Sequence, residues 1–123
     1  MHNPPLVLIL EDDPQLGKVY QAALRNAGFT VQIDPNGDQY ETFLETQIPD
    51  LMVLDMHLPF VSGPEVLQIL RSTDLWAKIP VIVVTADLFL AKSLQHKGEQ
   101  VLLKPFSVLR LAELANALTG RAA

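Results

Sequence analysis

The sequence predicts an α/β fold in which a five-stranded, doubly wound parallel sheet carries helices on both faces. One reason is that five short apolar segments alternate along the chain with longer segments of helical periodicity. Another is that most of the short segments are continuous apolar runs, which are typical of strands buried on both faces of a parallel sheet. The chain has 123 residues, of which 49% are hydrophobic, and this is enough for one domain with a hydrophobic core. We therefore expect residues 1–123 to form a single domain.

The first strand is predicted at residues 6–10, which read Leu-Val-Leu-Ile-Leu. A helix follows over about residues 14–27. Asp13 is its expected N-cap, because Pro14 then occupies the first helical position, and Gly28 supplies a stop.

The second strand is predicted at residues 30–34, where apolar and polar residues alternate as in a half-covered edge strand. The next helix is expected to start with Asn36 as N-cap and Gln39 as its reciprocal N3 partner, and to end near Thr46. The central strand is predicted at residues 51–55, where four apolar residues end on a carboxylate.

The third helix is expected to begin at a capping box formed by Ser62 and Glu65. Further strands are predicted at residues 79–84 and 101–103, and further helices over about residues 87–97 and after Ser107. These alternating elements complete the predicted sheet, with right-handed crossovers between its strands.

The composition argues against several classes of function. The formal net charge of −5 disfavours direct binding to nucleic acid or to an anionic membrane surface. The absence of cysteine excludes disulfides and thiolate metal sites. No apolar run approaches the roughly 20 residues needed to cross a bilayer, and the N-terminus lacks the basic region of a signal peptide. We expect a cytoplasmic protein.

Four of the predicted strands end on polar residues of complementary types. These are Glu11 with Asp12, Asp55, Thr85 and Lys104. A single polar residue at such a position can simply mark where a strand reaches solvent. Because the carboxyl ends of parallel strands share one edge of the sheet, however, all five side chains are expected to be neighbours.

Three carboxylates at one edge need positive charge, since two of them about 4 Å apart repel by about 4 kcal/mol at an effective dielectric near 20. Lys104 supplies one charge, and Mg²⁺ bound to Glu11, Asp12 and Asp55 supplies the rest. A carboxylate beside a metal, an ammonium and a hydroxyl can accept a phosphoryl group. We predict that Asp55 attacks in line while Thr85 donates a hydrogen bond.

The motifs that carry this chemistry are residues 8–14, residues 55–59 with Gly63, residues 83–86 and residues 104–106. In this order and spacing the chain resembles the receiver domain of two-component response regulators, over essentially its full length. The resemblance implies a flavodoxin-like sheet of order 2-1-3-4-5 and a phosphoacceptor at Asp55. It also implies phosphate contacts from Thr85 and Lys104, and a cis peptide before Pro105.

The same resemblance implies Mg²⁺ held by Glu11, Asp12, Asp55 and the backbone carbonyl of His57. It implies a phosphoryl donor that is a phosphohistidine of a sensor histidine kinase or of a histidine phosphotransfer protein. The output then passes by contact to a downstream protein target that the sequence does not identify, and a homodimer is a possible form. Such a protein is not an enzyme beyond its own phosphoryl transfer and autodephosphorylation.

The chain departs from the family pattern on one face. Val101 stands where the family usually has an aromatic ring that moves with the threonine. The segment between Thr85 and Lys104 is also shorter than the family's by nearly a turn of helix. We expect intact phosphorylation with altered or weakened output through the fourth helix and fifth strand. His57 and Asp87 are expected at the rim of the site, as solvent-facing loop residues or as groups that tune the lifetime of the acyl phosphate.

Two other functions compete with this interpretation. One is an aspartyl-phosphate hydrolase, which needs a second acid two residues after its nucleophile; here that residue is His57, and there is no room for a cap domain. The other is a degenerate receiver that acts as a phosphorylation-independent interaction module. Val101 and the short fourth helix favour this alternative, and the complete set of acids, Thr85 and Lys104 opposes it.

Overall fold

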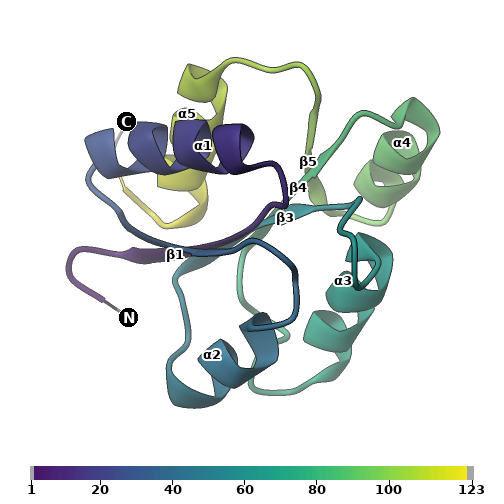
Figure 1. Ribbon diagram of the computed structural model, residues 1–123, viewed down its shortest axis with the longest axis horizontal. Coiled ribbons are helices and arrows are strands. Elements are labelled where there is room, and N and C mark those ends of the chain that lie inside the picture. The colour runs from purple at the N-terminus through teal and green to yellow at the C-terminus, as the bar shows by residue number, and fades with distance from the viewer. Residues whose placement is uncertain (1, 122–123) are drawn as a thin grey trace.

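The computed structural model describes residues 2–121 and contains one parallel sheet of order β2-β1-β3-β4-β5 (Figure 1). The strands are β1 (Leu6–Leu10), β2 (Thr30–Asp34), β3 (Leu51–Asp55), β4 (Val81–Thr85) and β5 (Gln100–Leu103). The helices are α1 (Pro14–Asn26), α2 (Tyr40–Thr46), α3 (Gly63–Ser72), α4 (Leu88–His96) and α5 (Val108–Leu118). The predicted fold class and strand order are confirmed.

The sheet separates two helical layers. Figure 1 shows α1 and α5 on one face, and α2, α3 and α4 on the other. Side chains alternate between the faces, so that Val7 and Ile9 of β1 lie in the core beneath α1 and α5, whereas Leu8 and Leu10 lie in the other core. All five residues of β1, β3 and β4 are buried, as continuous apolar runs predict.

Side-chain caps start four of the helices. The cap residues are Asp13, Ser62, Asp87 and Ser107, and their oxygens accept the backbone N–H of Gln15 and Leu16, of Glu65, of Leu90 and of Arg110 at 2.9 to 3.2 Å. The caps predicted for α1, α3 and α5 are therefore confirmed. They fix where each helix leaves the carboxyl edge of the sheet.

The predicted start of α2 is wrong. The helix begins at Tyr40, and Gln39 precedes it without a side-chain cap bond. The buried Asp34 carboxylate instead accepts the N–H groups of Asn36, Gly37 and Gln39 at 3.3, 3.0 and 2.9 Å. Because one aspartate at the end of β2 satisfies all three amides, the intervening residues form a turn (35–39, the β2–α2 turn) and not a first helical turn.

Among residues 2–121, no helix combines the length and the apolar character that spanning a lipid bilayer requires.

Candidate functional site

The predicted cluster of carboxylates lies at the carboxyl edge of the sheet. Because β1 and β3 pair with Leu10 opposite Leu54, the residues that follow Leu10 lie next to Asp55. Carboxylate oxygens of Glu11, Asp12 and Asp55 all lie within 4.8 Å of one another. Among the described residues this is the only such group of acidic or histidine side chains with metal-ligand spacing.

Burial makes this cluster electrostatically costly without a cation. Glu11 is 2% exposed and Asp55 is 4% exposed, whereas Asp12 faces solvent. Burial, with the neighbouring Asp55 carboxylate adding to it, raises the pKa of Glu11 from 4.5 to about 7, although Lys104 opposes the rise. The buried carboxylates of Glu11 and Asp55, next to the exposed carboxylate of Asp12, are a donor set that suits a hard divalent cation such as Mg²⁺. The fourth ligand expected from the resemblance, the His57 carbonyl, stays a prediction.

Lys104 places a positive charge beside both Glu11 and Asp55. Its Nζ lies 3.4 Å from Glu11 Oε1 and 3.8 Å from Asp55 Oδ2. The backbone N–H of Lys104 donates to the Thr85 carbonyl at 2.8 Å, which fixes the lysine where β5 ends beside β4. The peptide bond between Lys104 and Pro105 is cis, as the resemblance implies.

Thr85 is fully buried, and its hydroxyl contacts two loop residues. Oγ1 accepts the backbone N–H of Asp87 at 3.0 Å and lies 3.3 Å from His57 Nε2. The backbone N–H of His57 donates to Asp55 Oδ1 at 3.1 Å. His57 therefore bridges Asp55 and Thr85, while the Asp87 carboxylate caps α4. Both residues are exposed at the rim of the site, as expected.

The contact between His57 and Thr85 was not predicted from the sequence. Thr85 ends β4 and His57 follows the end of β3 by two residues, and these strands are adjacent, so the neighbourhood could be inferred. The side-chain rotamer that brings the His57 imidazole next to the Thr85 hydroxyl could not be inferred from the sequence.

Gly63 belongs to one of the sequence motifs, but its packing role emerges only from the structure. A Cβ at this position would lie 2.4 Å from Met56 Cα and 2.8 Å from the Asp55 carbonyl oxygen. The Gly63 N–H donates to the Met56 carbonyl at 3.2 Å. The start of α3 therefore lies directly against the backbone that carries Asp55, and only glycine permits this approach.

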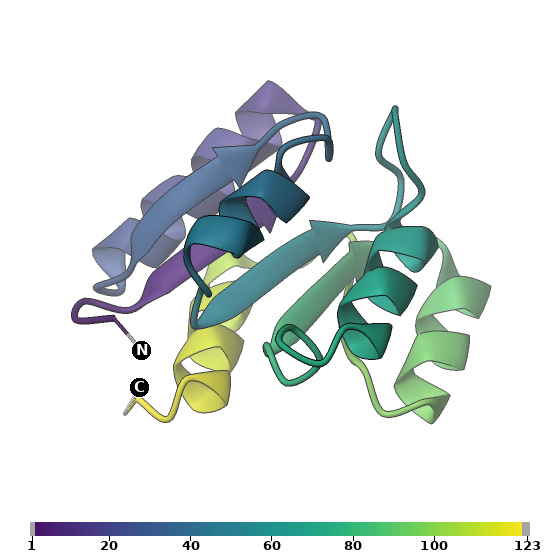
Figure 2. The ribbon, with the colours of Figure 1, turned by 90° about the horizontal axis from the view of Figure 1, so that it is seen from below.

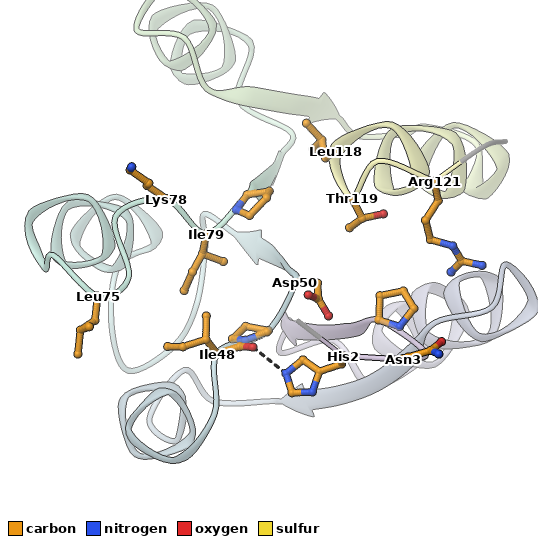
Figure 3. Close-up of a pocket in the computed structure, with 13 residues that line it drawn as sticks. His2, Asn3, Ile48, Asp50, Leu75, Lys78, Ile79, Leu118, Thr119 and Arg121 are labelled. Atoms are coloured by element: carbon orange, nitrogen blue, oxygen red, sulfur yellow. Dashed lines mark hydrogen bonds between the residues drawn. The ribbon is translucent and has the colours of Figure 1, made fainter.

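A cavity lies at the opposite, amino edge of the sheet (Figure 3). It measures about 570 Å³ and is lined by residues from both ends of the described chain, among them His2 and Leu118. Two of its polar groups serve the fold, because His2 Nε2 hydrogen-bonds to the Ile48 carbonyl at 2.8 Å and the Asp50 carboxylate accepts the Leu6 N–H at 2.8 Å. It shares no residue with the carboxylate cluster.

Comparison with known proteins agrees with this geometry. The model of the response regulator receiver domain family matches residues 7–116. The chain is 31% identical over 121 residues to the phosphate regulon transcriptional regulatory protein PhoB of Rhizobium meliloti (strain 1021), a match that covers 96% of this chain and 53% of that protein. It superimposes on the Francisella response regulator 1452 receiver domain with a TM-score of 0.85 and 25% identity, covering 94% of this chain and 97% of the other.

The fold and the acidic edge thus define a flavodoxin-like α/β protein whose polar strand ends meet in one site. The chain belongs to the response regulator receiver domain family of two-component signalling. It spans about half the length of several curated relatives that it matches, such as PhoB at 53% and the DNA-binding dual master transcriptional regulator RpaA of Synechocystis sp. (strain ATCC 27184 / PCC 6803 / Kazusa) at 50%.

Proposed function

We propose that residues 1–123 form one receiver module that is switched by phosphorylation of Asp55. The environment of the Asp55 carboxylate is the main support for this proposal. It is buried at the end of the central strand, in one cluster with the carboxylates of Glu11 and Asp12, and the Lys104 ammonium lies 3.8 Å from its Oδ2. This arrangement combines a nucleophile with charges suited to a phosphoryl group.

In the proposed transfer an Asp55 carboxylate oxygen attacks the phosphorus of a phosphohistidine in line. The new O–P bond forms as the P–N bond breaks, and the electron pair returns to the imidazole nitrogen of the donor. Lys104 and the Thr85 hydroxyl offer donors to the phosphoryl oxygens. Mg²⁺ held by Glu11, Asp12, Asp55 and the His57 carbonyl supplies charge neutralisation when it is bound. Hydrolysis of the acyl phosphate by water returns the free carboxylate.

The proposed donor is a sensor histidine kinase or a histidine phosphotransfer protein, and the output is contact with a further protein. No catalysis beyond transfer to Asp55 and the loss of that phosphate is assigned. The complete set of Glu11, Asp12, Asp55, Thr85 and Lys104 within one site argues against a phosphorylation-independent interaction module.

Intact-protein mass spectrometry after incubation with acetyl phosphate and Mg²⁺ tests the proposal. We expect one phosphate adduct in the parent and in Asp38→Asn, a matched control at an exposed acid of the β2–α2 turn. We expect none in Asp55→Asn. An adduct that persists in Asp55→Asn, or its absence from all three proteins, would contradict the assignment.

A further inference from the structure

His57 joins the phosphoacceptor to a part of the surface that lies away from α4 and β5. Its backbone N–H donates to Asp55 Oδ1 at 3.1 Å, and its Nε2 lies 3.3 Å from Thr85 Oγ1. Because His57 is exposed while Thr85 is fully buried, the imidazole is the outward contact of the Thr85 side chain.

The hydrogen-bonding capacity of Thr85 makes this contact sensitive to phosphorylation. A hydroxyl has one proton and two lone pairs, and the Asp87 N–H already donates to Oγ1. When the proton of Thr85 points to His57 Nε2, it is unavailable to any other acceptor. A phosphoryl group on Asp55 is a stronger, charged acceptor for the same proton. With the imidazole in the tautomer whose Nε2 carries no proton, Thr85 is the donor in this contact, and phosphorylation and the bond from Thr85 to His57 are then mutually exclusive.

The residues after His57 pack against the β2–α2 turn. Leu58 is buried in the same core cluster as Tyr40 and Leu44 of α2. A Cβ on Gly37 would lie 3.0 Å from Leu58 Cδ1 and 2.9 Å from Val61 Cγ1, so these two side chains lie directly over the backbone of the turn.

The backbone of Gly37 is fixed by a hydrogen bond and has a positive φ. Its N–H donates to Asp34 Oδ1 at 3.0 Å, and its φ of +76° is a conformation that glycine adopts without strain. Figure 2 shows the β3–α3 loop (residues 56–62) and the β2–α2 turn projecting at the same end of the sheet. A change in the loop therefore reaches the turn through direct contact.

The side of the molecule formed by α4 and β5 is poorly suited to respond to phosphorylation. Val101 in β5 is a half-buried aliphatic residue packed against the core under α4. It has no ring that could exchange an exposed for a buried position, and a β-branched side chain has few rotamers to choose from.

We propose that His57 carries the phosphorylation signal from Thr85 to the β2–α2 turn at Gly37, through the packing of Leu58 and Val61 on that turn. In the unphosphorylated protein Thr85 donates to His57 and holds the loop. In the phosphorylated protein Thr85 donates to a phosphoryl oxygen, the imidazole is released, and the loop and turn shift to a second population. The inference rests on the proposed function, because it requires Asp55 to carry the phosphoryl group.

Amide NMR spectra of the full chain test the relay, with beryllium fluoride and Mg²⁺ as a stable mimic of the phosphoryl group. The reporters are the amides of Gly37 for the turn and of Thr85 for the site. In the parent we expect both to shift when the mimic is added. In His57→Ala we expect Thr85 still to shift while the change at Gly37 falls several-fold.

Two further variants separate the relay from a general structural effect. His96→Ala removes another exposed histidine, at the end of α4, and should leave the change at Gly37 as in the parent. Val61→Ala keeps His57 but removes a methyl contact over Gly37, and it should reduce the change at Gly37 while Leu58 still responds.

The inference is overturned if Thr85 shifts in the parent without Gly37, or if Gly37 responds equally in the parent and in His57→Ala. A parent in which neither amide responds, together with no phosphate adduct by mass spectrometry, would instead refute phosphorylation of Asp55, and the relay with it.

Discussion

Replacing Gly63 by alanine is expected to damage both stability and phosphorylation. The new Cβ would lie 2.4 Å from Met56 Cα and 2.8 Å from the Asp55 carbonyl oxygen. Since ordinary carbon contacts are near 3.5 to 4.0 Å, the two backbones must separate by about 1 Å. Both obstacles are main-chain atoms, so no side-chain rotation can relieve the overlap.

The expected loss of stability follows from two opposing effects. Overpacking of this kind costs about 1–3 kcal/mol, and alanine regains up to about 1 kcal/mol of helix propensity. We expect a net loss of about 1–2 kcal/mol, which lowers the Tm by roughly 4–8 °C. Because a displacement of about 1 Å at a reacting group can slow a reaction by about 10²-fold, phosphorylation by acetyl phosphate should slow by about 10- to 100-fold.

Gly17 offers a matched control within the same chain. It also lies in a helix, and a Cβ there would meet only Ile33 Cδ1, at 3.7 Å, which is an ordinary contact. Gly17→Ala should therefore keep or raise stability, by up to about 1 kcal/mol. Urea unfolding and phosphorylation rates for both variants are the assay. Equal stability of Gly63→Ala and Gly17→Ala, with parental phosphorylation, would refute the reasoning.

Four further predictions concern ionisable side chains. The pKa of Glu11 is raised from 4.5 to about 7, so its protonated form stabilises the fold below pH 4.5, and this contribution of up to about 3 kcal/mol is lost as the pH rises to 7. Urea unfolding of the metal-free protein at a series of pH values should show this loss of stability. The loss should be absent in Glu11→Gln. Asp12→Ala, at the exposed carboxylate, should weaken Mg²⁺ binding by at least about tenfold in calorimetric titration with little change in Tm. Arg71→Ala removes a bidentate pair with Glu99, at 2.8 and 3.2 Å, and two bonds to carbonyls of the following loop, so it should cost about 1–3 kcal/mol in urea unfolding. His57→Ala should change the lifetime of the acyl phosphate several-fold, and a lifetime equal to the parent's would dismiss that role.

The elements that sequence reasoning predicted well are those with strong local signals. Residues 6–10 and 51–55 are continuous apolar runs, and such runs have few alternatives to a buried parallel strand. Ser62 and Ser107 carry caps whose partners are only three residues away. The start of α2 was wrong because Asn36 matches a cap pattern equally well in the sequence, while Asp34 outcompetes it in three dimensions.

Some features of the site could also be predicted from the sequence, and others could not. Sheet topology alone brings Glu11, Asp12 and Asp55 to one edge, so their proximity was predictable. The bond between His57 and Thr85 depends on a rotamer, and the closeness of Gly63 to Asp55 depends on how α3 packs. Neither leaves a periodic or compositional signal in the sequence.

The central claim is that one particular carboxylate, Asp55, receives the phosphoryl group. Reduction of the phosphorylated protein with borohydride converts an aspartyl phosphate to homoserine, and peptide mass spectrometry then identifies the modified position. We expect homoserine at position 55 in the parent, dependent on Mg²⁺. Homoserine at position 12 or 13 instead, or at no position in a protein that carries the phosphate adduct, would contradict the account.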